Sequence, residues 1–265
     1  MIEKIRYIKK YNESFDSSDI VEDVKNITKW LKEYLKISGA KGFVIGLSGG
    51  VDSSAVCGLA VDAAGKENVI GILLPSIVGY KDDVLDGKRV AKHYGIKYIV
   101  HPIKETVSTI IKENKDMPTM AIANIQARIR MTLLRMYAEL NGYLVIGTTN
   151  KSEDMLGYFT KSGDGGSGVD VEPLSQYYKS EIKKFAKYYK LPYDLVNRVP
   201  SAGLWANQTD EGELGFTYDD FENYWKWKLS KNGDCPVTEE VVKKIEKLYR
   251  TTEHKRNLPP YYKRK

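Results

Sequence analysis

The residues with the clearest chemical potential form a glycine- and serine-rich turn, Gly46-Leu47-Ser48-Gly49-Gly50-Val51-Asp52-Ser53. The turn follows a continuous apolar run and precedes a helical pattern. Its adjacent glycines allow backbone conformations closed to other residues and let a ligand approach the main chain. Successive N–H groups and the positive end of the helix dipole would then face one point. The turn therefore predicts an anion-binding site, to which the serine hydroxyl groups add donors.

Asp52 is the unusual residue of this turn, because a carboxylate repels phosphate unless a cation lies between them. Mg²⁺ held jointly by carboxylate and phosphate oxygens would resolve the conflict. The alternative is that Asp52 is simply a first-turn acidic residue favoured by the helix dipole, but this leaves the preceding Ser-Gly-Gly unexplained. The turn contains neither the Gly-Lys-[Ser/Thr] of a Walker A motif nor the Gly-x-Gly-x-x-Gly of dinucleotide-binding folds.

The segments around the turn alternate between apolar runs, which predict strands, and patterns of helical period. The predicted strands are residues 42–47, 68–74, 97–100 and 143–147, and the predicted helices are residues 19–37, 52–64, 82–94, 105–113 and 119–141. This order predicts an α/β fold with a Rossmann-like, doubly wound, mainly parallel sheet and helices on both faces. Residues 162–171 and 199–215 show no such period, and we expect binding loops there.

The composition is that of a globular protein. The chain has 265 residues and a formal net charge of +6, which favours anionic partners but does not by itself indicate nucleic acid. The two cysteines, Cys57 and Cys235, are too few for a disulfide framework or a cysteine zinc site and suit a reducing compartment. No apolar run approaches the ~18 residues of a spanning helix. We therefore expect a cytoplasmic protein that contacts neither membrane nor nucleic acid.

The turn resembles the Ser-Gly-Gly-x-Asp-Ser motif of the PP-loop ATP pyrophosphatases, which cleave ATP between the α and β phosphates. Residues 147–161, with the sequence Gly-Thr-Thr-Asn-Lys-Ser-Glu-Asp-Met-Leu-Gly-Tyr-Phe-Thr-Lys, are similar to a segment of one family within them, the NAD synthetases. The resemblance continues in order through Asp164-Gly-Gly, residues 200–205, residues 208–215 and Glu253-His254-Lys255-Arg256. Several segments in the same order are far more specific than one loop.

The resemblance implies an ATP-dependent ligase that makes NAD in two steps. The nicotinate carboxylate of deamido-NAD attacks the α phosphorus of ATP, which gives an adenylate and pyrophosphate. Ammonia then attacks the activated carbonyl and releases NAD and AMP. The first step needs no general base, because a carboxylate is already ionised at pH 7.

The resemblance also assigns ligands to residues of this chain. ATP contacts would come from Gly46, Leu47, Ser48, Gly49, Gly50, Val51, Asp52, Ser53, Thr148, Lys179 and Ser201. Contacts to deamido-NAD would come from Tyr34, Arg128, Lys161, Asp170, His254 and Lys255. Asp52 and Glu153 would hold Mg²⁺, and Asp52 and Lys179 would act directly in catalysis.

Two of these assignments depend on a choice. Arg128 and Arg130 lie two positions apart on a predicted helix and face different ways, and the resemblance selects Arg128. Two extra residues precede Asp170; we place them at Ser167 and Gly168, which leaves the register of Asp170 open by two positions. An arginine that many relatives carry after the second strand is also missing from residues 74–80.

The resemblance further predicts the nitrogen source and the assembly. About 41 residues, none of them cysteine, precede the first predicted strand, too few for a glutaminase domain. We therefore expect a single NAD synthetase domain over residues 1–265 that uses free ammonia. The family is homodimeric with deamido-NAD at the subunit interface, so Tyr34 and His254 would serve opposite subunits. We expect residues 76–82 and 201–215 to order over the site when ligands bind.

Two other functions remain open from the residues. One is a tRNA-modifying PP-loop enzyme, against which the absence of zinc or iron–sulfur spacing and of a basic appendage counts. The other is a non-catalytic nucleotide-binding protein. Against it counts the presence of Asp52, Glu153 and Lys179 together.

Overall fold

The computed structural model describes residues 19–76, 80–114, 116–201, 203, 205 and 208–262, without the side chains of residues 80–82 and 167. The segments expected to order over the site, residues 76–82 and 201–215, lie partly outside the described residues. No helix in the described part of the chain is long and apolar enough to cross a membrane.

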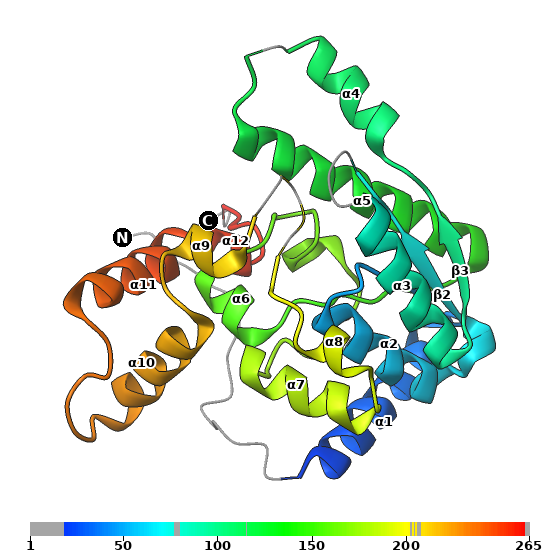
Figure 1. Ribbon diagram of the computed structural model, residues 1–265. Coiled ribbons are helices and arrows are strands. Elements are labelled where there is room, and N and C mark those ends of the chain that lie inside the picture. The colour runs from blue at the N-terminus through cyan, green and yellow to red at the C-terminus, as the bar shows by residue number, and fades with distance from the viewer. Residues whose placement is uncertain are drawn as a thin grey trace.

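A parallel sheet forms the centre of the molecule (Figure 1). Its strands are β1 (Phe43–Gly46), β2 (Val69–Leu73), β3 (Lys97–Val100) and β4 (Leu144–Val145), in the order β3-β2-β1-β4. Val44 of β1 stands opposite Ile70 of β2 and Val145 of β4. The first three strands are neighbours in the order in which they occur along the chain, and a helix lies in each connection between them.

Helices cover both faces of the sheet because neighbouring strand residues point to opposite sides. On one face, Phe43 and Ile45 join a core with α1 (Ile20–Ser38), α2 (Val51–Ala64), α3 (Tyr80–Tyr94), α7 (Lys179–Tyr188) and α8 (Tyr193–Val196). On the other face, Val44 packs with α4 (Lys104–Lys112) and α5 (Thr119–Asn141). The predicted α/β fold is confirmed.

A separate cluster of helices lies beside the sheet domain, toward the C-terminus (Figure 1). It joins α6 (Lys151–Leu156) to α9 (Asp210–Leu214), α10 (Tyr218–Ser230) and α11 (Glu239–Thr251), and a short α12 (Glu253–Arg256) follows. Its core is aromatic, with Tyr178, Phe221 and Trp225 buried at the centre. The cluster gives α6 and α7, which flank the sheet edge, a second packing surface.

Strand and helix positions agree with the predicted ranges to within about two residues, and the helix predicted at residues 119–141 matches α5 at both ends. Asp19 caps α1, because its carboxylate accepts the N–H of Val21 at 2.9 Å. The predicted loop at 199–215 is interrupted by α9, which Thr209 caps. Five residues are too few to show a helical period, so the sequence pattern could not reveal α9.

Candidate active site

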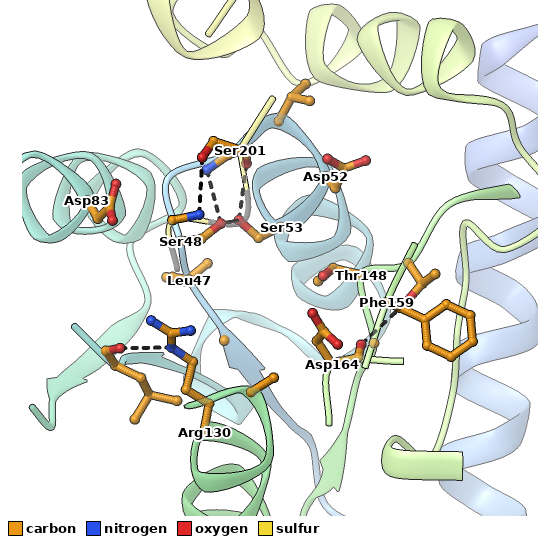
Figure 2. A pocket seen from close by; sticks show the side chains of 18 of the residues that line it. Leu47, Ser48, Asp52, Ser53, Asp83, Arg130, Thr148, Phe159, Asp164 and Ser201 are labelled. Carbon is orange, nitrogen blue, oxygen red and sulfur yellow. Dashed lines mark hydrogen bonds between the residues drawn. The ribbon is translucent and has the colours of Figure 1, made fainter. Parts of the chain in front are cut away.

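A cavity of about 290 Å³ opens at the carboxyl edge of the sheet, where open parallel sheets place their ligands. Its walls come from the turn after β1, the end of β2, helix α5 and the segment after β4 (Figure 2). Of the residues predicted to contact ATP, those that line it are Gly46, Leu47, Ser48, Gly50, Val51, Asp52, Ser53, Thr148, Lys179 and Ser201. Gly49 belongs to the same turn but does not itself line the cavity.

The turn itself has the conformation that its glycines predict. Gly49 has φ +77°, and a Cβ there would lie 2.5 Å from the Cβ of Asp86, so only glycine fits. The hydroxyl of Ser48 accepts the Gly50 N–H at 3.2 Å and lies 3.2 Å from the hydroxyl of Ser53. Gly50 is the N-cap of α2 and provides no side-chain cap, which leaves the first amides of the helix for a ligand.

The strongest polar cluster of the cavity gathers around one ammonium group. Lys179 Nζ donates to Asp52 Oδ2 at 2.7 Å and to Glu153 Oε1 at 2.9 Å. These three residues come from the first turns of α2, α6 and α7, which are far apart in the sequence. Each is mostly buried, with only 8–17% of its side chain exposed. The fold therefore assembles both predicted metal-binding carboxylates and the predicted catalytic lysine.

Neighbouring groups hold this cluster in place. The Asn150 side chain donates to Asp52 Oδ1 at 2.8 Å and accepts the Glu153 N–H, while Glu153 Oε2 accepts the Asn150 N–H in return. Behind Lys179, its own N–H donates to Ser152 Oγ, which in turn donates to Glu222 of α10. The C-terminal helices thereby position a residue of the cavity.

Burial and charge shift the proton affinities of the cluster. Burial raises the pKa of the Glu153 carboxyl well above its usual range, against the pull of Lys179. Burial also raises the pKa of Asp210, which lines the cavity and is only 4% exposed. For Lys179, burial works to lower the pKa, but the charges of Asp52 and Glu153 outweigh it and raise it. At both carboxyls, burial thus favours the protonated, uncharged form, and the nearby charge of Lys179 opposes this effect.

These residues fit a magnesium ion. Asp52 and Glu153 supply hard carboxylate oxygens that are close enough for both to contact Lys179 Nζ, and such oxygens are the ligands that Mg²⁺ prefers. Among the described residues, no group of three or more His, Cys, Asp and Glu side chains is placed to hold a metal alone. Mg²⁺ commonly takes one or two protein carboxylates and completes its shell with substrate phosphates and water, so a pair suffices.

The residues predicted to contact deamido-NAD lie outside this cavity. Lys161 donates to the backbone carbonyl of His254 at 2.6 Å, and Lys255 donates to the carbonyls of Gly157 and Phe159. The fold therefore brings Lys161, His254 and Lys255 together at one surface.

The other predicted contacts to deamido-NAD lie elsewhere. Arg128 is exposed on α5 and lines a shallow depression together with Arg135. Asp170 forms an ion pair with Arg135 at 2.6 Å and accepts the Val145 N–H at 2.7 Å. Tyr34 packs on α1 against the core of the sheet domain. Their roles toward deamido-NAD stay predictions.

Arg130, rather than Arg128, faces the cavity. Its Nε donates to the carbonyl of Leu74 at 3.1 Å, and Figure 2 shows its guanidinium directed toward the turn. The helical spacing correctly separated the two arginines, but the choice of face depended on how α5 packs. Asp83, Asp164, Arg198 and Asp210 also line the cavity. Of these, Asp164 and Asp210 stood in segments that carried the resemblance, although no role was assigned to them.

Comparisons with known proteins agree with this geometry. The family model of NAD synthase matches residues 23–259. The NH(3)-dependent NAD(+) synthetase of Pyrococcus furiosus is 43% identical over 238 residues, which cover 86% of this chain and 91% of that protein. The solved NMN synthetase of Francisella tularensis matches with a TM-score of 0.81 at 33% sequence identity. The match covers 90% of this chain and 96% of the Francisella chain.

A second solved structure, the NH3-dependent NAD synthetase of Campylobacter jejuni, matches with a TM-score of 0.78 at 28% sequence identity. The match covers 92% of this chain and all of the Campylobacter chain. The likeness thus extends over the sheet, the glycine-rich turn and the C-terminal helices. With the family model spanning most of the sequence, this chain belongs to the NAD synthase family.

Proposed function

We propose that this chain is an ammonia-dependent NAD synthetase. It adenylates the nicotinate carboxylate of deamido-NAD with ATP and then exchanges AMP for ammonia. The observation that carries the proposal is the meeting of Asp52, Glu153 and Lys179 at the glycine-rich turn, inside a cavity at the sheet edge. Such a cluster would bind a metal–triphosphate and stabilise the pyrophosphate that leaves.

The ATP site would work by position and charge. The turn amides and the hydroxyl groups of Ser48 and Ser53 face the cavity and would hold phosphate oxygens. Lys179, held between two carboxylates, would stabilise the charge that moves onto the leaving pyrophosphate. Mg²⁺ bound by Asp52 and Glu153 would supply charge neutralisation on the phosphate oxygens. Binding the ion would also favour the charged form of the Glu153 carboxylate, which burial disfavours.

The second step requires a nitrogen nucleophile, and we propose free ammonia. We propose that the sheet and the C-terminal helices of the described residues belong to a single NAD synthetase domain. Neither cysteine is suited to glutaminase chemistry in the described structure: Cys57 is fully buried in the core, where burial raises the pKa of its thiol, and Cys235 belongs to the aromatic cluster. Glutamine should therefore not replace ammonium.

We further propose a homodimer that completes the deamido-NAD site. Of its six predicted contacts, Lys161, His254 and Lys255 lie together near α12, whereas Tyr34 is on α1, which Figure 1 shows in a different part of the molecule. In the proposed dimer, a second copy would add contacts that lie apart from one another within a single chain. The amphipathic α1 also exposes Trp30 and Ile37 beside Tyr34, apolar area that a partner copy would cover.

A second candidate substrate is favoured by one comparison. The structural neighbour from Francisella tularensis is named an NMN synthetase. The corresponding substrate for this chain would be nicotinate mononucleotide, which has the same reactive carboxylate but lacks the AMP half of deamido-NAD. The chemistry at the cavity would be the same, and only the contacts to the missing half would differ.

The test is to measure AMP, pyrophosphate and amide product with ATP, Mg²⁺ and each nucleotide substrate. We expect AMP and NAD in equal amounts with deamido-NAD and ammonium, and no product with glutamine. Faster turnover of nicotinate mononucleotide would establish the second candidate. Pyrophosphate release only with tRNA would overturn the proposal in favour of an RNA-modifying enzyme, and no release with any substrate would indicate a binding protein.

The protein would act in the cytoplasm, where ATP and a reducing environment coexist. A buried free thiol at Cys57 suits such a compartment. Fractionation of cells that express the protein would test this, with recovery in a membrane or secreted fraction as the contrary result.

A further inference from the structure

The cavity contains basic side chains beyond the family assignments. Among the described residues that line it, the lysines and arginines are Arg130, Lys179 and Arg198. Lys179 is shared by Asp52 and Glu153, and Arg130 lies across the cavity against the carbonyl of Leu74. Arg198 is the cation that lies directly against the glycine-rich turn.

The contacts of Arg198 define its position closely. Its Nη1 lies 3.2 Å from where a Cβ of Gly49 would stand, so the guanidinium touches the turn at its left-handed residue. Its two terminal nitrogens pair with carboxylates of α3: Nη2 with Asp83, and Nη1 with Asp86 at 3.2 Å. About a third of the Arg198 side chain remains exposed, on the side of the cavity.

We infer that Arg198 is a phosphate-binding residue of the ATP site, which Asp83 and Asp86 hold against the glycine-rich turn. The inference rests on the proposed function for the identity of the anion, pyrophosphate or the β and γ phosphates of ATP. Asp83 faces the same cavity as Ser48 and Ser201 (Figure 2). A phosphate group in the turn would compete with this carboxylate for the arginine.

Charge and geometry both favour a phosphate for this arginine. The turn lacks the lysine of a Walker A motif, so its amides need a cation from elsewhere in the chain. A guanidinium presents two parallel N–H donors that match phosphate oxygens, and such charge-assisted bonds are the strong ones. Arg198 also stands three residues before Ser201, the predicted ATP contact, on the same strip of cavity wall.

A neighbouring arginine provides a matched control. Arg89 also pairs with Asp86, at 2.9 Å, and with Asp194, but it does not line the cavity. Removing Arg89 would disturb the same ion-pair network without removing a donor from the phosphate site. A purely structural role for the network therefore predicts equal effects of Arg89→Met and Arg198→Met.

The experiment is calorimetric titration of the full chain with inorganic pyrophosphate in the presence of Mg²⁺, followed by titration with ATP. We expect Arg198→Met to weaken pyrophosphate binding about ten- to 100-fold, the value of one charge-assisted phosphate contact. Arg198→Lys should recover part of the loss, and Arg89→Met should bind within about threefold of the parent chain. Thermal unfolding of each variant verifies that it is folded.

Arg198→Met also leaves the Asp83 carboxylate unpaired beside the phosphate, and this negative charge could weaken binding by itself. One further variant separates this effect from the loss of a direct contact between Arg198 and the phosphate. In the double variant Arg198→Met/Asp83→Asn, Asp86 still keeps Arg89, and we expect the weakened binding to persist. Recovery of parent affinity in the double variant would overturn the inference, and so would equal losses in the Arg89 and Arg198 variants. Since pyrophosphate binding is measured without turnover, an absence of NAD formation would contradict the proposed function but leave this result intact.

Discussion

The two substrate regions of this protein differ in how completely one chain builds them. All but one of the residues predicted to hold ATP line one cavity, in which Lys179 Nζ donates both to Asp52 and to the predicted metal ligand Glu153. The residues predicted to hold deamido-NAD line no part of that cavity, and several bind other parts of their own chain. Lys161, for example, donates to the His254 carbonyl, and Asp170 is paired with Arg135.

This difference follows from how the two regions are supported. The ATP residues stand at helix starts and strand ends, which the sheet brings to one edge. Helix starts are rigid and place a side chain reproducibly. The other region draws on the surface of α5, on Tyr34 of α1 and on the short α12, which the sheet does not bring together. The first site is therefore preformed within one chain, and for the second we propose that a second copy completes it.

The largest expected effect tests the preformed site. Asp52→Asn removes the charge that faces Lys179 and the proposed metal, so AMP formation should fall by at least about 100-fold. The measurement is pyrophosphate release in a single turnover. Asp62→Asn is the control, since this carboxylate lies on the same helix but accepts the hydroxyl of Tyr189 far from the turn. Adenylation at the parent rate in Asp52→Asn would contradict the role of the cluster.

The next largest effect tests the proposed dimeric deamido-NAD site by dilution of the protein. If two copies complete the deamido-NAD site, activity per chain should fall about ten-fold once sedimentation shows mostly monomer, because the monomer lacks half of the contacts. Pyrophosphate affinity, which depends on the preformed cavity, should stay constant. A monomer with full activity would refute the dimeric site.

A smaller effect tests the support that the C-terminal helices give to the cavity. Glu222 is buried and accepts the hydroxyl groups of Ser152 and Ser180, so it joins α10 to α6 and α7. Glu222→Gln should lower the free energy of unfolding by about 1–3 kcal/mol and raise the KM for ATP, because Lys179 loses its support. Denaturant unfolding and steady-state kinetics measure these two changes.

Asp219→Asn is the matched control for Glu222, since Asp219 is an exposed residue of the same helix. Equal effects of the two substitutions would show that Glu222 does not position the cavity.

The smallest expected effect concerns Asp170. Its carboxylate is already engaged by Arg135 and the Val145 N–H, so Asp170→Asn should mainly lower stability, by about 1–2 kcal/mol, and change the KM for deamido-NAD only a few-fold. Arg135→Met should lower stability similarly, because it breaks the same pair. A large rise in the KM with unchanged stability would instead show that Asp170 contacts the substrate directly, as the resemblance predicts.

Much of the fold was predictable because its signals are local. Buried parallel strands are continuous apolar runs, and α5 shows its helical period over its whole length. No helix after residue 150 was assigned from the pattern. The helices α6, α8 and α9, with six, four and five residues, are too short to show a helical period, whereas α7, α10 and α11, with 10, 13 and 13 residues, are long enough and were missed. Side-chain caps and packing in the C-terminal cluster hold α6 and α9, and α8 packs against α7 in the core of the sheet domain; these contacts leave no periodic trace in the sequence.

The candidate site divides in the same way. By itself, the sequence determined the glycine-rich turn, since its function resides in consecutive residues, and the residue types of the metal pair and the lysine. Only the tertiary structure decided that Arg130 rather than Arg128 faces the cavity, and that Arg198 lies against Gly49. The direction of a side chain depends on which face of its helix is buried and which loop lies opposite. These are contacts between residues tens of positions apart, and no local pattern records them.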